Sequence, residues 1–410
     1  MTNRISFSQP AQRSGQEAAG SSRPHRAVDG LVASSGLLTG LSMMGLVPVL
    51  PRIEAAFGSE EGSGYLAKMV VAIVGLSIMA AAPLSGRIAR RFRCGNILVA
   101  SFLCYALAAI ASALAPSLGW LVAARFVQGI GVAIGVTTLL ALVGTLYEPY
   151  MRDRLLGWHM GGSALALLVI LPLAGAIGDL NWRLAPLLGL LSLAHLGLAL
   201  HARHHLSFRL SVNTGSGAPL DRATRIQALI LMVLAFLIGL ALYSPAAFVP
   251  FKMVSIGAGS GQVIGMIGSV ATAASALASL FYPRVVGRVT RTGVYALALP
   301  CCAASGIIMA MANSLVLVIL AQVIGGVGGG LLVAHIYVDC AERVAASSRA
   351  FAIGLVKSSS FAGLFAGPLL LEAVVAHSSI NVAFISIAAI AVAALVVVRT
   401  FPQSKARDYE

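Results

Sequence analysis

The most constraining feature of the sequence is an apolar run, residues 121–143, that contains a single charged residue, Arg125. About 20 apolar residues, each rising 1.5 Å along a helix, span the ~30 Å hydrocarbon core of a bilayer. An arginine inside such a span costs about 3 kcal/mol on insertion scales, so its side chain must face protein or a watery cavity. Gln128 follows three residues later and shares a helix face with Arg125. The run therefore predicts a transmembrane helix with a polar pair on one face.

The composition extends this prediction to the whole chain. Of the 410 residues, 58% are hydrophobic and only 10% are charged, whereas about a quarter of a soluble domain is charged. This balance is typical of a helical membrane protein with many spans. We expect twelve transmembrane helices, at about 28–50, 65–86, 96–116, 119–143, 156–178, 184–202, 226–250, 262–283, 293–312, 315–338, 351–375 and 380–399.

The polar stretches between these spans suggest the domain organisation. We expect a disordered cytoplasmic tail at 1–27, because it is polar and lacks the features of a cleavable signal peptide. The longest internal polar stretch, 203–224, is predicted to be a cytoplasmic linker between a six-helix bundle at 28–202 and another at 225–401, with a short tail at 402–410.

The two predicted halves also share features at an offset near 200 residues. The matches are Pro48 and Pro51 with Pro245 and Pro250, Pro83 with Pro283, Arg125-x-x-x-Gly129-x-Gly131 with Gln322-x-x-x-Gly326-x-Gly328, and Pro172 with Pro368. Repeated six-helix halves are typical of transporters, whose substrate site lies between the repeats.

The distribution of basic residues predicts the orientation. If both termini are cytoplasmic, 22 of the 28 lysines and arginines lie in the tails and the cytoplasmic connections, as the positive-inside rule requires. The same distribution explains the net charge of +14 without nucleic acid as a partner.

The pattern Arg125-x-x-Gln128-Gly129-x-Gly131 in the fourth apolar segment resembles the helix 4 signature of the major facilitator superfamily. After the second segment, Gly86 and Arg91 fit the family's loop signature, but Arg90 stands where the family has an aspartate. This substitution implies that a family lock on the cytoplasmic gate is altered. The resemblance implies an all-α membrane protein with twelve helices in two pseudo-symmetric bundles, in which the glycines serve gating and helix packing.

Further residues resemble one branch of this family, the drug:proton antiporters and sugar-efflux carriers. Pro48 and Pro51 match the paired-proline ending of helix 1, and Pro172 with Gly175 supplies half of a helix 5 pattern. In helix 11, Gly367 and Pro368 are expected to serve gating and packing in the same way. The resemblance implies an exporter of a small organic molecule in the cell (inner) membrane. An organic-anion exchanger, or an uptake carrier without proton coupling, is the alternative.

Charge within the spans suggests the substrate. Arg125 and Lys357 are the two cations within spans, His335 lies in the tenth segment, and no carboxylate occupies the middle of a span. We expect Arg125 and Lys357 to face the central cavity and to favour an anionic or carboxylate-bearing substrate, with His335 as the proton-sensitive group. Each residue has a structural alternative. Arg125 could bond backbone carbonyls and Gln128, Lys357 could snorkel to the cytoplasmic surface, and His335 could be a packed neutral imidazole.

Other classes of function lack their sequence signatures. The sequence shows no paired carboxylates, nucleotide loop or metal-ligand spacing of the kind that a membrane enzyme needs, and the five cysteines fit packing positions. We therefore expect no enzyme activity, cofactor or metal. The expected protein is a monomer in the lipid bilayer whose partners are a small substrate and, as candidate coupling ions, protons.

Overall fold

The computed structural model describes residues 26–210, 222–344 and 349–399, which form helices and short connections without a strand. Twelve helical segments in these ranges are long and apolar enough to cross a membrane. The prediction of twelve transmembrane helices is therefore confirmed, and each observed span overlaps its predicted segment. The predicted tails at 1–27 and 402–410 lie almost wholly outside the described residues.

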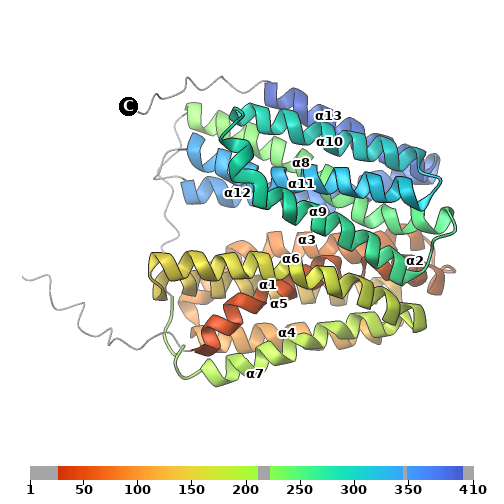
Figure 1. Ribbon diagram of the computed structural model, residues 1–410. Coiled ribbons are helices and arrows are strands. Elements are labelled where there is room, and N and C mark those ends of the chain that lie inside the picture. The colour runs from red at the N-terminus through yellow and green to blue at the C-terminus, as the bar shows by residue number, and fades with distance from the viewer. Residues whose placement is uncertain (1–25, 211–221, 345–348, 400–410) are drawn as a thin grey trace, which may run out of the picture.

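The first six spans form one bundle, called here the N-bundle (Figure 1). Its first span is interrupted near a pair of prolines, and its last begins as a 3-10 helix. In chain order its elements are α1 (Arg26–Met44), η1 (Val47–Val49), α2 (Leu50–Ala56), α3 (Ser63–Arg91), α4 (Cys94–Ala113), α5 (Leu118–Leu146), α6 (Pro149–Leu180), η2 (Trp182–Leu191) and α7 (Ser192–Ala202).

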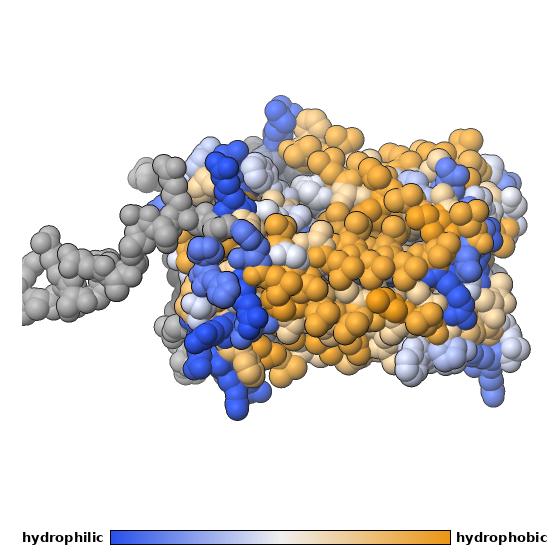
Figure 2. Space-filling view, turned by 90° about the horizontal axis from the view of Figure 1, so that it is seen from below, coloured by the Kyte–Doolittle hydropathy of each residue, from blue (hydrophilic) through white to orange (hydrophobic). Residues whose placement is uncertain are grey.

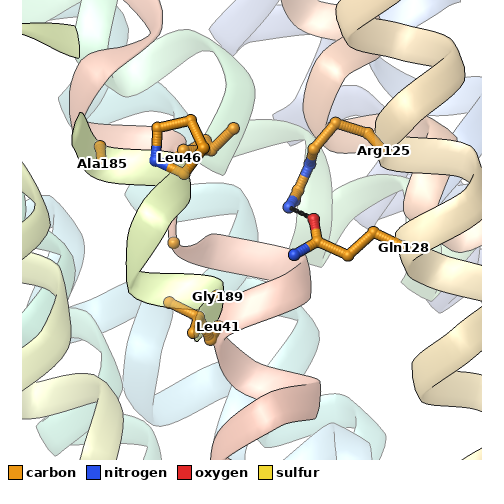
Figure 3. A pocket seen from close by; sticks show the side chains of 8 residues that line it. Leu41, Leu46, Arg125, Gln128, Ala185 and Gly189 are labelled. Atoms are coloured by element: carbon orange, nitrogen blue, oxygen red, sulfur yellow. Dashed lines mark hydrogen bonds between the residues drawn. The ribbon is translucent and has the colours of Figure 1, made fainter. Parts of the chain in front are cut away.

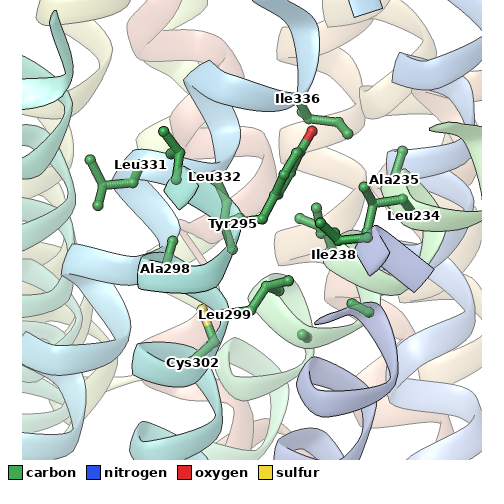
Figure 4. Close-up of a cluster of buried hydrophobic side chains, with 14 of the residues drawn as sticks. Leu234, Ala235, Ile238, Tyr295, Ala298, Leu299, Cys302, Leu331, Leu332 and Ile336 are labelled. Carbon is green, nitrogen blue, oxygen red and sulfur yellow. The ribbon is translucent and has the colours of Figure 1, made fainter. Parts of the chain in front are cut away.

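The last six spans form the C-bundle, which lies beside the N-bundle in Figure 1. Its elements are α8 (Arg222–Ser255), α9 (Gly261–Val286), α10 (Arg291–Met311), α11 (Leu315–Arg343), α12 (Arg349–His377) and α13 (Ile380–Arg399). Each bundle has its own buried apolar core, and the C-bundle core surrounds the ring of Tyr295 (Figure 4). The bundles meet mainly along two helix pairs, α6 with α9 and α3 with α12, and η1 and α2 also contact the C-bundle.

The outer surface of the molecule matches a bilayer. Figure 2 shows a broad apolar band between two ends that carry the hydrophilic residues. The end where α1 begins and α13 ends is called here the tail end, and the opposite one the far end. Exposed leucines and valines on the spans, such as Leu165 and Val169, need lipid rather than water around them. The protein is therefore a multi-pass membrane protein.

The predicted linker 203–224 is shorter than the sequence suggested, because both of its ends belong to the bundles. Leu206 and Leu210 are buried in the N-bundle core. The carbonyls of Leu206 and Phe208 accept hydrogen bonds from the first backbone N–H groups of α4, at Gly95 and Cys94, each over 3.0 Å. These groups at a helix start have no partner within the helix, so the segment after α7 caps α4. The C-bundle already begins at Arg222.

Candidate functional site

Asp179, near the end of α6, fastens the two bundles together at the far end. Its carboxylate accepts hydrogen bonds from the hydroxyl of Ser260, at 2.8 Å, and from the backbone N–H groups of Gly261, at 2.7 Å, and Gln262, at 3.1 Å. These groups form the start of α9, where unpaired N–H groups and the helix dipole favour an anion. Arg52 pairs with the same carboxylate at 2.6 Å. An N-bundle residue thus caps a C-bundle helix.

A second set of charges joins the bundles at the same end. The ammonium of Lys68, on α3, lies 3.0 Å from Glu372 of α12 and 3.7 Å from Glu54 of α2. The ring of Phe251, on α8, lies 4.3 Å from this ammonium and covers it. Sequence reasoning missed this cluster, because Lys68 and Glu372 sit near the ends of spans that are far apart in the chain.

Close backbone contact between α6 and α9 completes the closure. A methyl group on Gly175 would lie 1.9 Å from the carbonyl oxygen of Gly261, and one on Gly265 would lie 2.2 Å from that of Leu171. Nearer the middle of the spans, Ser269 donates a hydrogen bond to the carbonyl of Leu168 over 3.0 Å. These contacts lie between the middle of the spans and the far end. The structure is therefore one that is closed at the far end.

Arg125 lies inside the N-bundle with 2% of its surface exposed. Its guanidinium donates to the backbone carbonyls of Ser42 and Val70 and, over 2.5 Å, to the side-chain oxygen of Gln128. Figure 3 shows this pair pointing into a small pocket between the first and last spans of the N-bundle, lined also by Leu41 and Gly189. Carbonyls of two neighbouring helices and Gln128 thus satisfy the guanidinium, as in the structural alternative for Arg125, and a place in a central cavity stays a prediction.

His335 is likewise enclosed, in this case within the C-bundle. Its Nδ1 is 2.9 Å from the hydroxyl of Tyr282, and its Nε2 is 2.9 Å from the carbonyl of Arg291. One turn further along α11, the buried carboxylate of Asp339 accepts a hydrogen bond from Tyr295 and pairs with Arg343 at 2.6 Å. Both ring nitrogens of His335 thus have partners within the bundle, as in the packed-imidazole alternative.

Lys357, on α12, has surroundings of a different kind. Its side chain is exposed at the surface of the protein. Neither a hydrogen bond nor an ion pair holds this ammonium within the described part of the chain. Lys357 therefore differs from Arg125, whose guanidinium is bonded within its own bundle. A place for Lys357 in a central cavity stays a prediction.

His159 is a residue that sequence reasoning missed. It is 5% exposed, and its Nδ1 lies 2.8 Å from the hydroxyl of Ser35 on α1. The α1 backbone passes so close that a methyl group on Gly36 would lie 2.0 Å from the His159 carbonyl oxygen. His159 is ten residues from the start of α6, and Lys357 is eight residues from the start of α12. Both therefore lie roughly 12–15 Å along their helices from the tail end.

The residues expected to serve gating and packing lie at several helix contacts. Methyl groups would meet Ser77 of α3 at 2.6 Å from Gly129, the Ser101 carbonyl of α4 at 2.9 Å from Gly131, and Ser244 of α8 at 2.2 Å from Gly367. Pro172 lies inside α6 beside the α9 contact, and Pro368 is buried inside α12. Gly86 is half-buried near the end of α3, and Arg91 is the exposed last residue of that helix.

At the tail end, a buried tyrosine ties α1 to the connection after α5. The hydroxyl of Tyr147 donates to the carboxylate of Asp29 over 2.5 Å. Burial and this neighbouring carboxylate raise the pKa of Tyr147 above its ordinary value. Asp29 is thus occupied within the N-bundle, as its place near the end of the span suggested. In the ranges that the structure describes, no three His, Cys, Asp or Glu residues are grouped so as to hold a metal ion.

Comparison with solved structures shows the same architecture. A D-xylose-proton symporter superposes with a TM-score of 0.74 at 14% identity, over 93% of this chain and 98% of that one. The nucleoside transporter NupG gives 0.72 at 14% identity, over 91% of this chain and 98% of that one. A peptide transporter, POT, gives 0.73 at 14% identity, over 90% and 93%. At these identities the likeness establishes the fold.

Sequence comparison establishes the family. A niacin transporter, NiaP, of Acinetobacter baylyi (strain ATCC 33305 / BD413 / ADP1) is 30% identical over 125 residues, which are 29% of this chain and 28% of that protein. The match thus spans little more than a quarter of the relative. A family model described as Major Facilitator Superfamily matches residues 32–254 and, again, 231–409, so that nearly all of both bundles is covered. The chain therefore belongs to the major facilitator superfamily.

Proposed function

We propose that this transporter carries a small organic anion, a monocarboxylate, across the cell (inner) membrane by alternating access, in the export direction. The observation that carries the proposal is the ammonium of Lys357, which lies within a span and has neither a hydrogen bond nor an ion pair among the described residues. A cation within a span is costly unless an anion accompanies it. A substrate carboxylate between the bundles supplies this anion during each cycle.

The likeness to a niacin transporter supports a carboxylate as the cargo. Niacin is a pyridine carboxylic acid and carries one negative charge at neutral pH, so it has the chemistry that Lys357 selects. The matched stretch is short. It supports a substrate with the negative charge of niacin rather than one with the pyridine ring of niacin. A monocarboxylate of this size is therefore the first class to test.

The arrangement of the bundles supports alternating access. An anion that binds Lys357 on α12 and also contacts the N-bundle would attract the two bundles toward each other on the tail side. Closure there can be balanced by release of the Asp179 and Lys68 contacts at the far end. If both termini are cytoplasmic, as the basic residues predict, the far end, where the bundles are in contact, is the outer one, and the paired-proline ending of the first span supports export.

The test is flux of radiolabelled nicotinate, benzoate and lactate in proteoliposomes, with nicotinamide as the uncharged counterpart of nicotinate. We expect saturable flux of at least one carboxylate, none of nicotinamide, and at least a tenfold loss in Lys357→Gln. Lys405→Gln, in the C-terminal tail, is the matched control and should retain flux. Equal flux by Lys357→Gln, or transport of cations in place of anions, would overturn the proposal. Loading from either side distinguishes export from the alternative, uptake or exchange.

A further inference from the structure

One side-chain amide inside the N-bundle lacks a hydrogen-bond acceptor. Gln128 is buried, with 2% of its surface exposed. The amide oxygen must be the atom that faces Arg125, over 2.5 Å, because a guanidinium can only donate. The amide nitrogen then lies on the pocket side of the side chain, toward Leu41 and Gly189 (Figure 3). In the part of the chain that the structure describes, its two N–H groups meet no acceptor.

The guanidinium of Arg125 adds further donors to the same pocket. It has five N–H groups and uses three of them in the bonds to Ser42, Val70 and Gln128. An N–H group that is removed from water without gaining an acceptor destabilises the fold. The pocket therefore offers hydrogen-bond donors that call for an acceptor. The rest of its wall is apolar or backbone, and consists of Leu41, Gly45, Leu46, Ala185, Pro186 and Gly189.

A backbone acceptor in the pocket wall has lost its usual donor. Gly45 follows the end of α1 and lines the pocket. In a continuous α-helix its carbonyl would accept a hydrogen bond from the N–H of Val49, but that N–H bonds the carbonyl of Leu46 over 3.1 Å. The chain tightens here into the 3-10 turn η1, which contains Pro48, a residue without an N–H. The break in the first span thus leaves a free carbonyl beside the free donors.

The size of the pocket and this mixture of groups select the ligand. The centre of a water molecule can move through about 10 Å³ there, which is room for one water and for no organic molecule. A halide ion could accept bonds from Gln128 and Arg125, but it cannot donate to the carbonyl of Gly45. Water can accept two hydrogen bonds and donate two, so it satisfies both kinds of group.

We propose that this pocket binds one ordered water molecule, which accepts hydrogen bonds from the amide of Gln128 and the guanidinium of Arg125 and donates one to the carbonyl of Gly45. The water replaces the helical hydrogen bond that the first span loses at its break. It also ties this break to α5, so that the kink is held by a bound molecule as well as by Arg125. The inference is independent of the cargo and of the direction of transport.

The first test is a crystal structure of the full chain at a resolution that shows ordered water, with bromide in place of chloride. We expect a density peak for one water within hydrogen-bonding distance of Nε2 of Gln128. The peak should disappear in Gln128→Met, which keeps the length of the side chain but removes the amide. An anomalous bromide peak in the pocket, or a pocket without density in the wild type, would overturn the inference.

The second test compares two side chains of equal shape at Ala185, which is 2% exposed and lines the pocket. Ala185→Val and Ala185→Thr both displace the water, but only the threonine hydroxyl can take over one of its hydrogen bonds. We expect the melting temperature of Ala185→Thr in detergent to exceed that of Ala185→Val by about 2 °C. Val132→Thr is the matched control, because Val132 is 1% exposed in the apolar core of the same bundle, and this change should lower the melting temperature. A threonine no more stabilising than valine at 185 would show that the pocket is dry.

Discussion

Replacing Asp179 by asparagine should shift the transporter toward opening at the far end. The carboxylate bonds three groups at the start of α9 and pairs with Arg52, and it does so from the other bundle. Asparagine has nearly the same shape, and its carbonyl oxygen can keep one of these bonds. The negative charge and the second acceptor oxygen are lost. The substitution therefore weakens the contact between the bundles without removing volume from the helix junction.

The size of the effect follows from the contacts. The ion pair with Arg52 is partly exposed, with 44% and 24% of the two side chains accessible, so it contributes about 0.5 kcal/mol. Loss of a negative charge at a helix start costs about 0.5–1 kcal/mol, and loss of a charge-assisted bond to a backbone N–H costs about 1 kcal/mol. The total of about 2 kcal/mol corresponds to a roughly 30-fold change in the ratio of far-end-open to far-end-closed molecules.

The assay is pulsed electron spin resonance between spin labels on Glu61 and Ser379, exposed far-end residues in different bundles. We expect a longer distance to gain population in Asp179→Asn. The matched control is Asp153→Asn, which makes the same chemical change in an exposed ion pair near the tail end. An unchanged distance distribution in Asp179→Asn, or an equal shift in the control, would refute the reasoning.

Two further predictions concern Arg125 and the topology. Arg125→Ala leaves the carbonyls of Ser42 and Val70 without a donor and should lower stability by about 3 kcal/mol. The stability of Arg125→Lys should lie between those of the wild type and Arg125→Ala, because an ammonium cannot reproduce the planar fork of the guanidinium. Thermal unfolding in detergent measures both effects. Wild-type stability and transport in Arg125→Ala would contradict a role for Arg125 in joining α1 and α3 through their carbonyls. For the topology, an impermeant thiol reagent outside the cell should label a cysteine placed at 60 or 258 but not at 215, a position outside the described residues. Labelling of 215 from outside would reverse the orientation.

The spans themselves could be predicted from the sequence, because each helix forms its backbone hydrogen bonds internally and needs only sufficient length and hydrophobicity. The polar pair Arg125 and Gln128 could also be predicted, since residues three apart share a face in any helix. The cap that residues 203–210 place on α4 could not be predicted, because it depends on the burial of Leu206 and Leu210 in the N-bundle core. The sequence of a polar stretch does not indicate which of its apolar residues will be buried.

The contacts between the bundles could not be predicted from the sequence either, because they too depend on the tertiary fold. The pairing of Lys68 with Glu372 joins positions some 300 residues apart, and no local pattern connects them. Both residues lie near span ends, where single charges are common and unremarked. A search for charges in mid-span therefore passes over a cluster that forms only when the two bundles dock.

The same limit decides what the cations within the spans mean. From the sequence alone, Arg125 and Lys357 are both cations within spans, and both are expected to favour an anionic substrate. In the folded protein, carbonyls of α1 and α3 and the amide of Gln128 surround Arg125, so its charge is stabilised without a substrate. Lys357 has neither a hydrogen bond nor an ion pair within the described part of the chain and gains no such stabilisation. The argument for an anionic substrate therefore rests on Lys357 alone. A cation that the fold stabilises through its own backbone carbonyls, as it does Arg125, needs no ligand.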